Sequence, residues 1–84
     1  MSVMTTEDIT QTVIDFIAQQ KAIPADSITP TTTFDELQMD SLDKINLSFE
    51  VEERFHISIP DNALDSLKTV ADIVAGVQRL QAAS

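Results

Sequence analysis

The apolar residues of this 84-residue chain recur at helical spacing rather than at the alternation of a β-strand. Thr5 and Asp8 form a pattern typical of a helix cap, and the apolar positions that follow predict a first helix over about residues 6–20: Ile9, Val13, Phe16 and Ile17. A second cap pair, Thr69 and Asp72, predicts a last helix over about residues 69–81. Its stripe is the most regular in the chain: Val70, Ile73, Val74, Val77 and Leu80.

A further helix, predicted from Ser41 to about Phe55, has two apolar sides. At 100° per residue, one stripe contains Leu42, Ile45 and Phe49, and a nearly opposite stripe contains Leu47, Val51 and Phe55. A small helical domain rarely has enough elements to cover both sides of a helix. We therefore expect one stripe in the core and the other at the surface or lining a cavity, and the periodicity alone favours neither.

The connections between these helices complete an all-α prediction. Pro24, Pro30 and the threonines at 31–33 prevent the first helix from continuing, which predicts a long loop over residues 21–39. Four apolar residues are expected to pin that loop to the core: Ile23, Ile28, Phe34 and Leu37. Residues 57–60 form a short extended connector, and a short third helix should run from Asp61 to about Leu67. We predict one domain over residues 1–84, a small four-helix bundle with three long helices and a short third one.

Composition narrows the classes of partner. Fourteen acids and five bases give a net charge of −9, which argues against binding to nucleic acid or to an anionic membrane surface. Residues 35–65 carry −7 of this charge, so the expected partners are basic. There is no cysteine and one histidine, which leaves no disulfide framework and no Cys/His zinc site. Residues 1–8 lack a targeting signal, and we expect a soluble, cytoplasmic monomer.

Ser41 is the candidate functional residue. It stands between Asp40 and Leu42 at the predicted start of the second helix. The first turn of a helix leaves N–H groups without partners and carries the positive end of the helix dipole, so a phosphate attached there would be stabilised. The same residue types also serve as ordinary helix caps, and an isolated Asp-Ser-Leu does not decide between the two roles.

Catalysis by the chain alone is not expected. A nucleophilic Ser41 would need a nearby base, but His56, the single histidine, is fifteen residues along the same predicted helix, or roughly 22 Å away. His56 is more typical of a cation at a helix C-terminus. Two classes remain: a carrier whose serine takes a covalent arm, and a small interaction domain whose second apolar stripe docks a partner helix.

Four segments together resemble the acyl carrier proteins over nearly the whole chain. They are FDELQMDSLD at 34–43, EERF at 52–55, ISIPD at 57–61 and TVAD at 69–72. Their order and spacing make the resemblance far more specific than Asp-Ser-Leu alone. It implies a non-catalytic carrier with 4′-phosphopantetheine, derived from coenzyme A, on Ser41. Acyl groups would be carried as thioesters on the thiol of this arm, for fatty acid, polyketide or related specialised biosynthesis. A peptidyl or aminoacyl carrier of a nonribosomal pathway is the alternative within this class.

The resemblance also implies roles for other residues. Asp40 and Leu42 would flank the attachment site, and partners would be a phosphopantetheinyl transferase and acyl-transferring, condensing or ligase enzymes with basic docking patches. The implied docking surface combines an apolar part with acids: Leu42, Ile45 and Phe49 with Asp40, Asp43, Glu52 and Glu53. Leu47, Val51 and Phe55 would then face the core. An acyl chain would shelter, or a partner would bind, in a cleft between the second and third helices lined by Ile59, Leu64 and Leu67.

Three residues depart from the family pattern. Gln38 stands where glycine is usual, and a left-handed backbone there would cost a non-glycine residue about 1 kcal/mol or more. Asn46 replaces an acid that is usual in carriers of fatty acid synthesis, and Lys44 adds a positive charge to the same helix. Together with the spacing from Phe34 to Ser41, these changes favour a stand-alone, specialised carrier that serves its own set of acyl enzymes.

Overall fold

Four α-helices and one short 3-10 turn make up the computed structural model, which describes residues 5–83. They are α1 (Thr6–Lys21), η1 (Ala25–Ser27), α2 (Ser41–Phe55), α3 (Asp61–Leu64) and α4 (Val70–Ala83). Residues 1–4, where the sequence shows no targeting signal, lie outside the described part. Within it the backbone forms no strand, only an isolated antiparallel bridge between Thr33 and Thr69. The predicted all-α bundle with a short third helix is confirmed.

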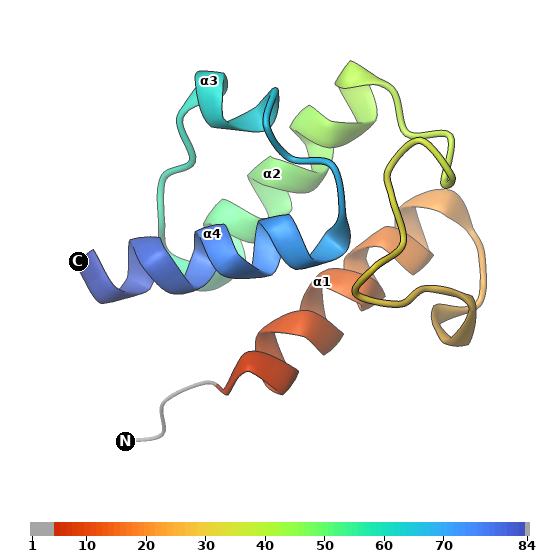
Figure 1. Cartoon of the computed structure of the whole chain (residues 1–84), viewed down its shortest axis with the longest axis horizontal. Helices are drawn as coiled ribbons and strands as arrows, with labels where there is room; N and C mark the ends of the chain where they lie inside the picture. The colour runs from red at the N-terminus through yellow and green to blue at the C-terminus, as the bar shows by residue number, and fades with distance from the viewer. Residues whose placement is uncertain (1–4, 84) are drawn as a thin grey trace.

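The long helices α1, α2 and α4 enclose the core, and α3 lies above α4 and to the left of the upper part of α2 in Figure 1. α1 packs against both α2 and α4, and α3 packs against α2. The buried side chains come from all three long helices and from the first loop. Separating any of these three helices from the others would therefore expose apolar surface to water. None of the helices in residues 5–83 is long and apolar enough to cross a bilayer.

Capping boxes begin the long helices at the places that the sequence predicts. Before α1, the Asp8 N–H donates to Thr5 Oγ1 and the Thr5 N–H donates to Asp8 Oδ2. Before α4, the Asp72 N–H donates to Thr69 Oγ1, while Asp72 Oδ2 accepts from the N–H groups of Lys68 and Thr69. These two backbone donors, Lys68 first, hold the pKa of Asp72 below its ordinary value.

The structure assigns the two stripes of α2 to different environments. Leu47 and Val51 are fully buried and Phe55 is nearly so, which places this stripe in the core. The other stripe faces outward: the side chains of Leu42, Ile45 and Phe49 are 64%, 37% and 60% exposed. Among the side chains that the structure describes, this outer stripe therefore supplies the exposed large apolar groups.

The long loop before α2 is ordered by burial and by backbone pairing. Phe34 and Ile28 are buried, with Ile23 and Leu37 packed beside them as predicted, and Met39 adds a buried side chain that the sequence analysis did not assign to the core. The Phe34 N–H donates to the Lys68 carbonyl (2.9 Å), so the loop is tied to the segment before α4. This attachment fixes the end of the loop from which α2 begins.

The third helix is shorter than predicted, ending at Leu64 instead of Leu67. After it, the N–H groups of Ser66 and Leu67 donate to carbonyls three residues back, which is 3-10 rather than α geometry. The Ser66 hydroxyl also donates to the Ala63 carbonyl (2.8 Å), a local bond that competes with helical pairing. The chain thus turns away from α3 toward α4 before a second helical turn can form.

Within residues 5–83, three non-glycine residues adopt the left-handed backbone region: Ala22, Gln38 and His56, with φ of 56°, 57° and 56°. Ala22 and His56 end α1 and α2, where this conformation lets a cap N–H reach a carbonyl of the preceding turn. Gln38 keeps the turn that glycine usually makes, and its N–H donates to the Asp35 carbonyl. The chain accepts a backbone strain of about 1 kcal/mol there so that Met39 can enter the core.

Candidate functional site

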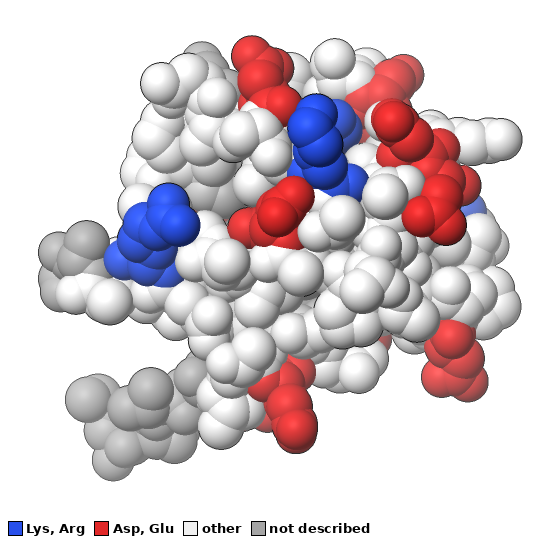
Figure 2. All heavy atoms as spheres, in the orientation of Figure 1, with Lys and Arg blue, Asp and Glu red and all other residues white. Residues whose placement is uncertain are grey.

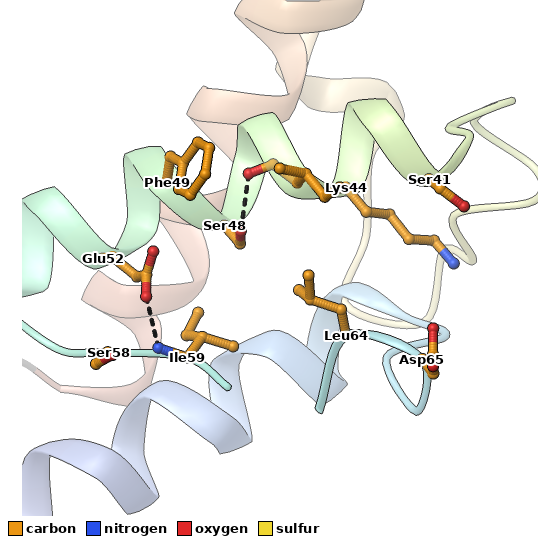
Figure 3. A pocket seen from close by; sticks show the side chains of 10 residues that line it. Ser41, Lys44, Ser48, Phe49, Glu52, Ser58, Ile59, Leu64 and Asp65 are labelled. Atoms are coloured by element: carbon orange, nitrogen blue, oxygen red, sulfur yellow. Dashed lines mark hydrogen bonds between the residues drawn. The ribbon is translucent and has the colours of Figure 1, made fainter. Parts of the chain in front are cut away.

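Ser41 is the first residue of α2, and its side chain is exposed. Asp40 is the N-cap: the Asp43 N–H donates to Asp40 Oδ1 (2.9 Å) and the Asp40 N–H donates to Asp43 Oδ2 (3.3 Å). This box uses both neighbouring aspartates to close the helix end, while the Ser41 hydroxyl points away from the helix (Figure 3). The helix start is thus capped without Ser41, which remains accessible for modification.

The end of α1 holds the start of α2 in place. Lys21 Nζ is 3.3 Å from Asp43 Oδ2 and donates to the Gln38 carbonyl (3.2 Å). The Gln20 amide donates to the Asp43 carbonyl (2.9 Å). No local pattern in the sequence indicates these contacts of Gln20 and Lys21, because they join residues 17 to 23 positions apart.

These contacts set the charge state of Asp43. Partial desolvation alone would raise the pKa of this carboxyl, but the backbone N–H of Asp40, the Lys21 ammonium and the Gln20 amide outweigh it and lower the pKa below the ordinary value. Asp43 therefore stays ionised well below neutral pH, and Lys21 offsets part of its charge next to Ser41.

A groove of about 630 Å³ begins at Ser41 and runs between α2 and the segment that carries α3. Its lining is mixed, with apolar side chains beside charged and hydroxyl groups: Ser41, Lys44, Ile45, Ser48, Phe49, Glu52, Ser58, Ile59, Leu64 and Asp65. Figure 3 shows Leu64 and Ile59 facing the α2 side chains across this space. Both residues thus line the space between α2 and α3, and their role in sheltering an acyl chain stays a prediction.

Leu67, predicted for the same cleft, lies elsewhere. It lines a separate apolar pocket of about 200 Å³ between α3 and α4, next to Ile73, Val77 and Leu80. The early end of α3 turns the chain before Leu67 and moves this side chain away from α2. Ile59 lines both cavities and forms the wall between them.

Glu52 has a structural contact that sequence reasoning missed. Its Oε2 accepts a hydrogen bond from the Ile59 N–H (2.7 Å), and Figure 3 shows this bond crossing the far end of the groove. The bond joins α2 to the connector at residues 57–60, so it fixes the Ile59 wall. Of the four acids predicted for docking, Asp40, Asp43 and Glu52 thus have partners within the chain, and Glu53 is exposed.

Acidic side chains gather on the surface where α2 begins, at the upper right of Figure 2. The exposed stripe of Leu42, Ile45 and Phe49 leads along α2 from this region. An apolar strip with acidic surroundings is complementary to a surface that combines basic and apolar groups.

Comparison with known proteins identifies the family. The model of the phosphopantetheine attachment site matches residues 11–77. The meromycolate extension acyl carrier protein of Mycobacterium tuberculosis is 34% identical over 79 residues, covering 93% of this chain and 69% of the relative. The chain belongs to the acyl carrier protein family. A mitochondrial acyl carrier protein of Dictyostelium discoideum is 37% identical over 73 residues, which cover 87% of this chain and 61% of that protein.

A solved structure confirms the fold. The crystal structure of an acyl carrier protein from Thermotoga maritima superposes with a TM-score of 0.79, covering 89% of this chain and 88% of the other at 21% identity. The resemblance seen in the sequence is thus supported by family, relatives and fold, and phosphopantetheine is the family's cofactor.

The residues around Ser41 fit such a group. The hydroxyl is exposed, the groove opens beside it, and the amides of Ser41 and Leu42 belong to the first helical turn, where no carbonyl one turn earlier accepts from them. An arm on Ser41 would therefore meet a site with donors for its phosphate and a channel for its length.

Removing the Glu52 carboxylate tests its role in the fold. Glu52→Ala should lower the free energy of unfolding by about 1–2 kcal/mol, because the Ile59 N–H loses a charged acceptor. Urea unfolding followed by circular dichroism would measure the difference. Glu53→Ala, which removes the same charge from an exposed neighbour, should change stability by less than about 0.5 kcal/mol. Equal losses of unfolding free energy in Glu52→Ala and Glu53→Ala would contradict a stabilising role for the Glu52–Ile59 hydrogen bond.

Proposed function

We propose that Ser41 is the attachment residue for 4′-phosphopantetheine and that the chain presents acyl thioesters to other enzymes. The observation that carries the proposal is the exposed Ser41 hydroxyl at the mouth of the groove, within the matched family domain. A phosphopantetheinyl transferase would join the Ser41 oxygen to the phosphate of coenzyme A, with loss of the hydroxyl proton and release of the nucleotide part. The arm supplies a terminal thiol, which this cysteine-free chain lacks.

The chain's own residues would do three things in this role. The capped start of α2 keeps Ser41 outside the fold, where a transferase can reach it. The first-turn amides of α2 stabilise a phosphate through hydrogen bonds and the helix dipole. Ile45, Ile59 and Leu64 give the groove an apolar side on which an acyl chain can shelter from water.

The proposed docking surface is the outer face of α2. Leu42 and Phe49 supply exposed apolar area, and Glu53 with the exposed Asp40 supplies negative charge for a basic partner patch. Asp43 and Glu52 were predicted for the same surface, but their carboxylates bind groups of the chain itself. They would contribute to docking mainly through the electrostatic field of their charges. Monomeric state and cytoplasmic location remain predictions from the sequence.

Loading with coenzyme A separates this function from that of an interaction domain without a prosthetic group. Incubation with a broad-specificity phosphopantetheinyl transferase should add the mass of one arm to the wild type and to Ser58→Ala, and none to Ser41→Ala. Ser58 is the matched control, because it is an exposed serine that lines the same groove. Intact mass spectrometry gives the result. Undiminished loading of Ser41→Ala, or no loading of folded wild type, would overturn the proposal.

The relatives are acyl carrier proteins, which favours acyl cargo over the aminoacyl or peptidyl cargo of a nonribosomal pathway. Within that class we assign the chain to a specialised pathway with its own enzymes, as the charge pattern of α2 indicates. Asn46 is exposed on this helix and Lys44 adds a cation, so the surface is less acidic than the family pattern.

Restoring the usual charges tests this assignment. Asn46→Glu, alone and with Lys44→Thr, should raise the turnover of the loaded chain by fatty acid synthesis enzymes several-fold, because complementary charge raises association rates. The measurement is the rate of acyl transfer at low salt, with Asn62→Glu as an exposed control on α3. Unchanged rates for both α2 variants would count against the specialised pathway.

A further inference from the structure

Lys44 lies one helical turn after Ser41 and lines the same groove. Side chains three positions apart on a helix are neighbours, with Cβ atoms about 5–6 Å apart. Long helical side chains also lean toward the helix N-terminus. Figure 3 shows Lys44 extended in this way, with its amino nitrogen at the Ser41 end of the groove.

The Lys44 ammonium has no carboxylate partner among the side chains that the structure describes. Among these side chains, the ion pair with a nitrogen–oxygen distance within 4.0 Å joins Lys21 to Asp43 and does not involve Lys44. Lys44 Nζ instead lies 5.7 Å from the ring centroid of Phe34, a contact that helps to hold the side chain in place. Asp65 lines the same groove, but no ion pair within 4.0 Å joins it to Lys44 among the described side chains.

A cation near Ser41 would offset the negative charge that surrounds a phosphodiester on this residue. The carboxylates of Asp40 and Asp43 flank the attachment point, and Lys21 offsets only the second of them. The capping box also occupies the Asp43 N–H, so it is not available as a third first-turn donor. The remaining amides of Ser41 and Leu42 face an anion that Asp40 repels, and Lys44 is the groove-lining cation.

We propose that Lys44 is a positioning residue for the prosthetic arm: its ammonium contacts the phosphodiester on Ser41 and directs the first part of the arm along the groove. The inference rests on the proposed attachment at Ser41. It gives Lys44 a role inside its own chain, which is distinct from an influence on partner choice. A charge-assisted contact of this kind favours one direction for the arm without closing the groove.

The test compares the loaded wild type with loaded Lys44→Gln, Lys44→Arg and Lys68→Gln. NMR relaxation of the arm's methyl groups next to the phosphate, with the phosphorus shift, reports how firmly that part of the arm is held. We expect Lys44→Gln to lower the ratio of contacting to free arm by about two- to five-fold, as for an exposed ion pair. Lys44→Arg should retain the contact, and Lys68→Gln, which changes an exposed lysine outside the groove lining, should match the wild type.

Salt and loading distinguish the outcomes. In about 1 M salt, where the Debye length is about 3 Å, the wild type should approach Lys44→Gln. Equal mobility of the wild type and Lys44→Gln at low salt, or an arginine variant that behaves like glutamine, would overturn the role of Lys44 alone. An unchanged intact mass after the loading reaction would instead overturn the attachment at Ser41 and this inference with it.

Discussion

The position of Ser41 depends on how the start of α2 is held. The Asp40–Asp43 capping box closes the helix end, and Lys21 and Gln20 of α1 bind the same aspartate from the other side. A helix N-terminus on a protein surface ordinarily frays, because its first turn lacks intrahelical partners. Here the Asp43 carboxylate completes the capping box with Asp40 and also joins two helices, so that Ser41 projects from a fixed point without taking part in the cap.

Charge in this chain has two separate uses. Some acids act within the fold, as Glu52 does when it accepts from the Ile59 N–H and fixes the groove wall. Others, such as exposed Glu53, contribute the field that attracts basic surfaces. Counting acids along α2 therefore overstates the number available for docking. The same distinction applies to cations, since Lys21 serves the fold and Lys44 faces the groove.

Local sequence patterns predicted the positions of the helices well. They did not predict features that depend on contacts between segments far apart in the chain. The two predicted cap pairs and the stripes of α1 and α4 act within one helical turn, so the sequence alone located those helices within a few residues. The outward direction of Leu42 and Phe49 needed the family resemblance, because both stripes of α2 are equally periodic. Leu67 was predicted for the cleft beside α2 but lines another pocket. The 3-10 hydrogen bonds that turn the chain after α3 cannot be inferred from the spacing of Leu64 and Leu67. The contacts of Lys21 and Glu52 join segments that only the folded chain brings together.

The most direct measurement of the central claim is amide hydrogen exchange at the start of α2. The N–H of Asp43 and that of Asp8 make equivalent capping bonds, but α1 binds Asp43 itself, whereas α4 contacts the start of α1 at Thr6 and not at Asp8. After correction for intrinsic rates, the Asp43 amide should exchange at least about five-fold more slowly than that of Asp8, the factor that about 1 kcal/mol provides. Equal protection of the two amides would contradict the account, because the start of α2 would then be no better fixed than an ordinary helix end.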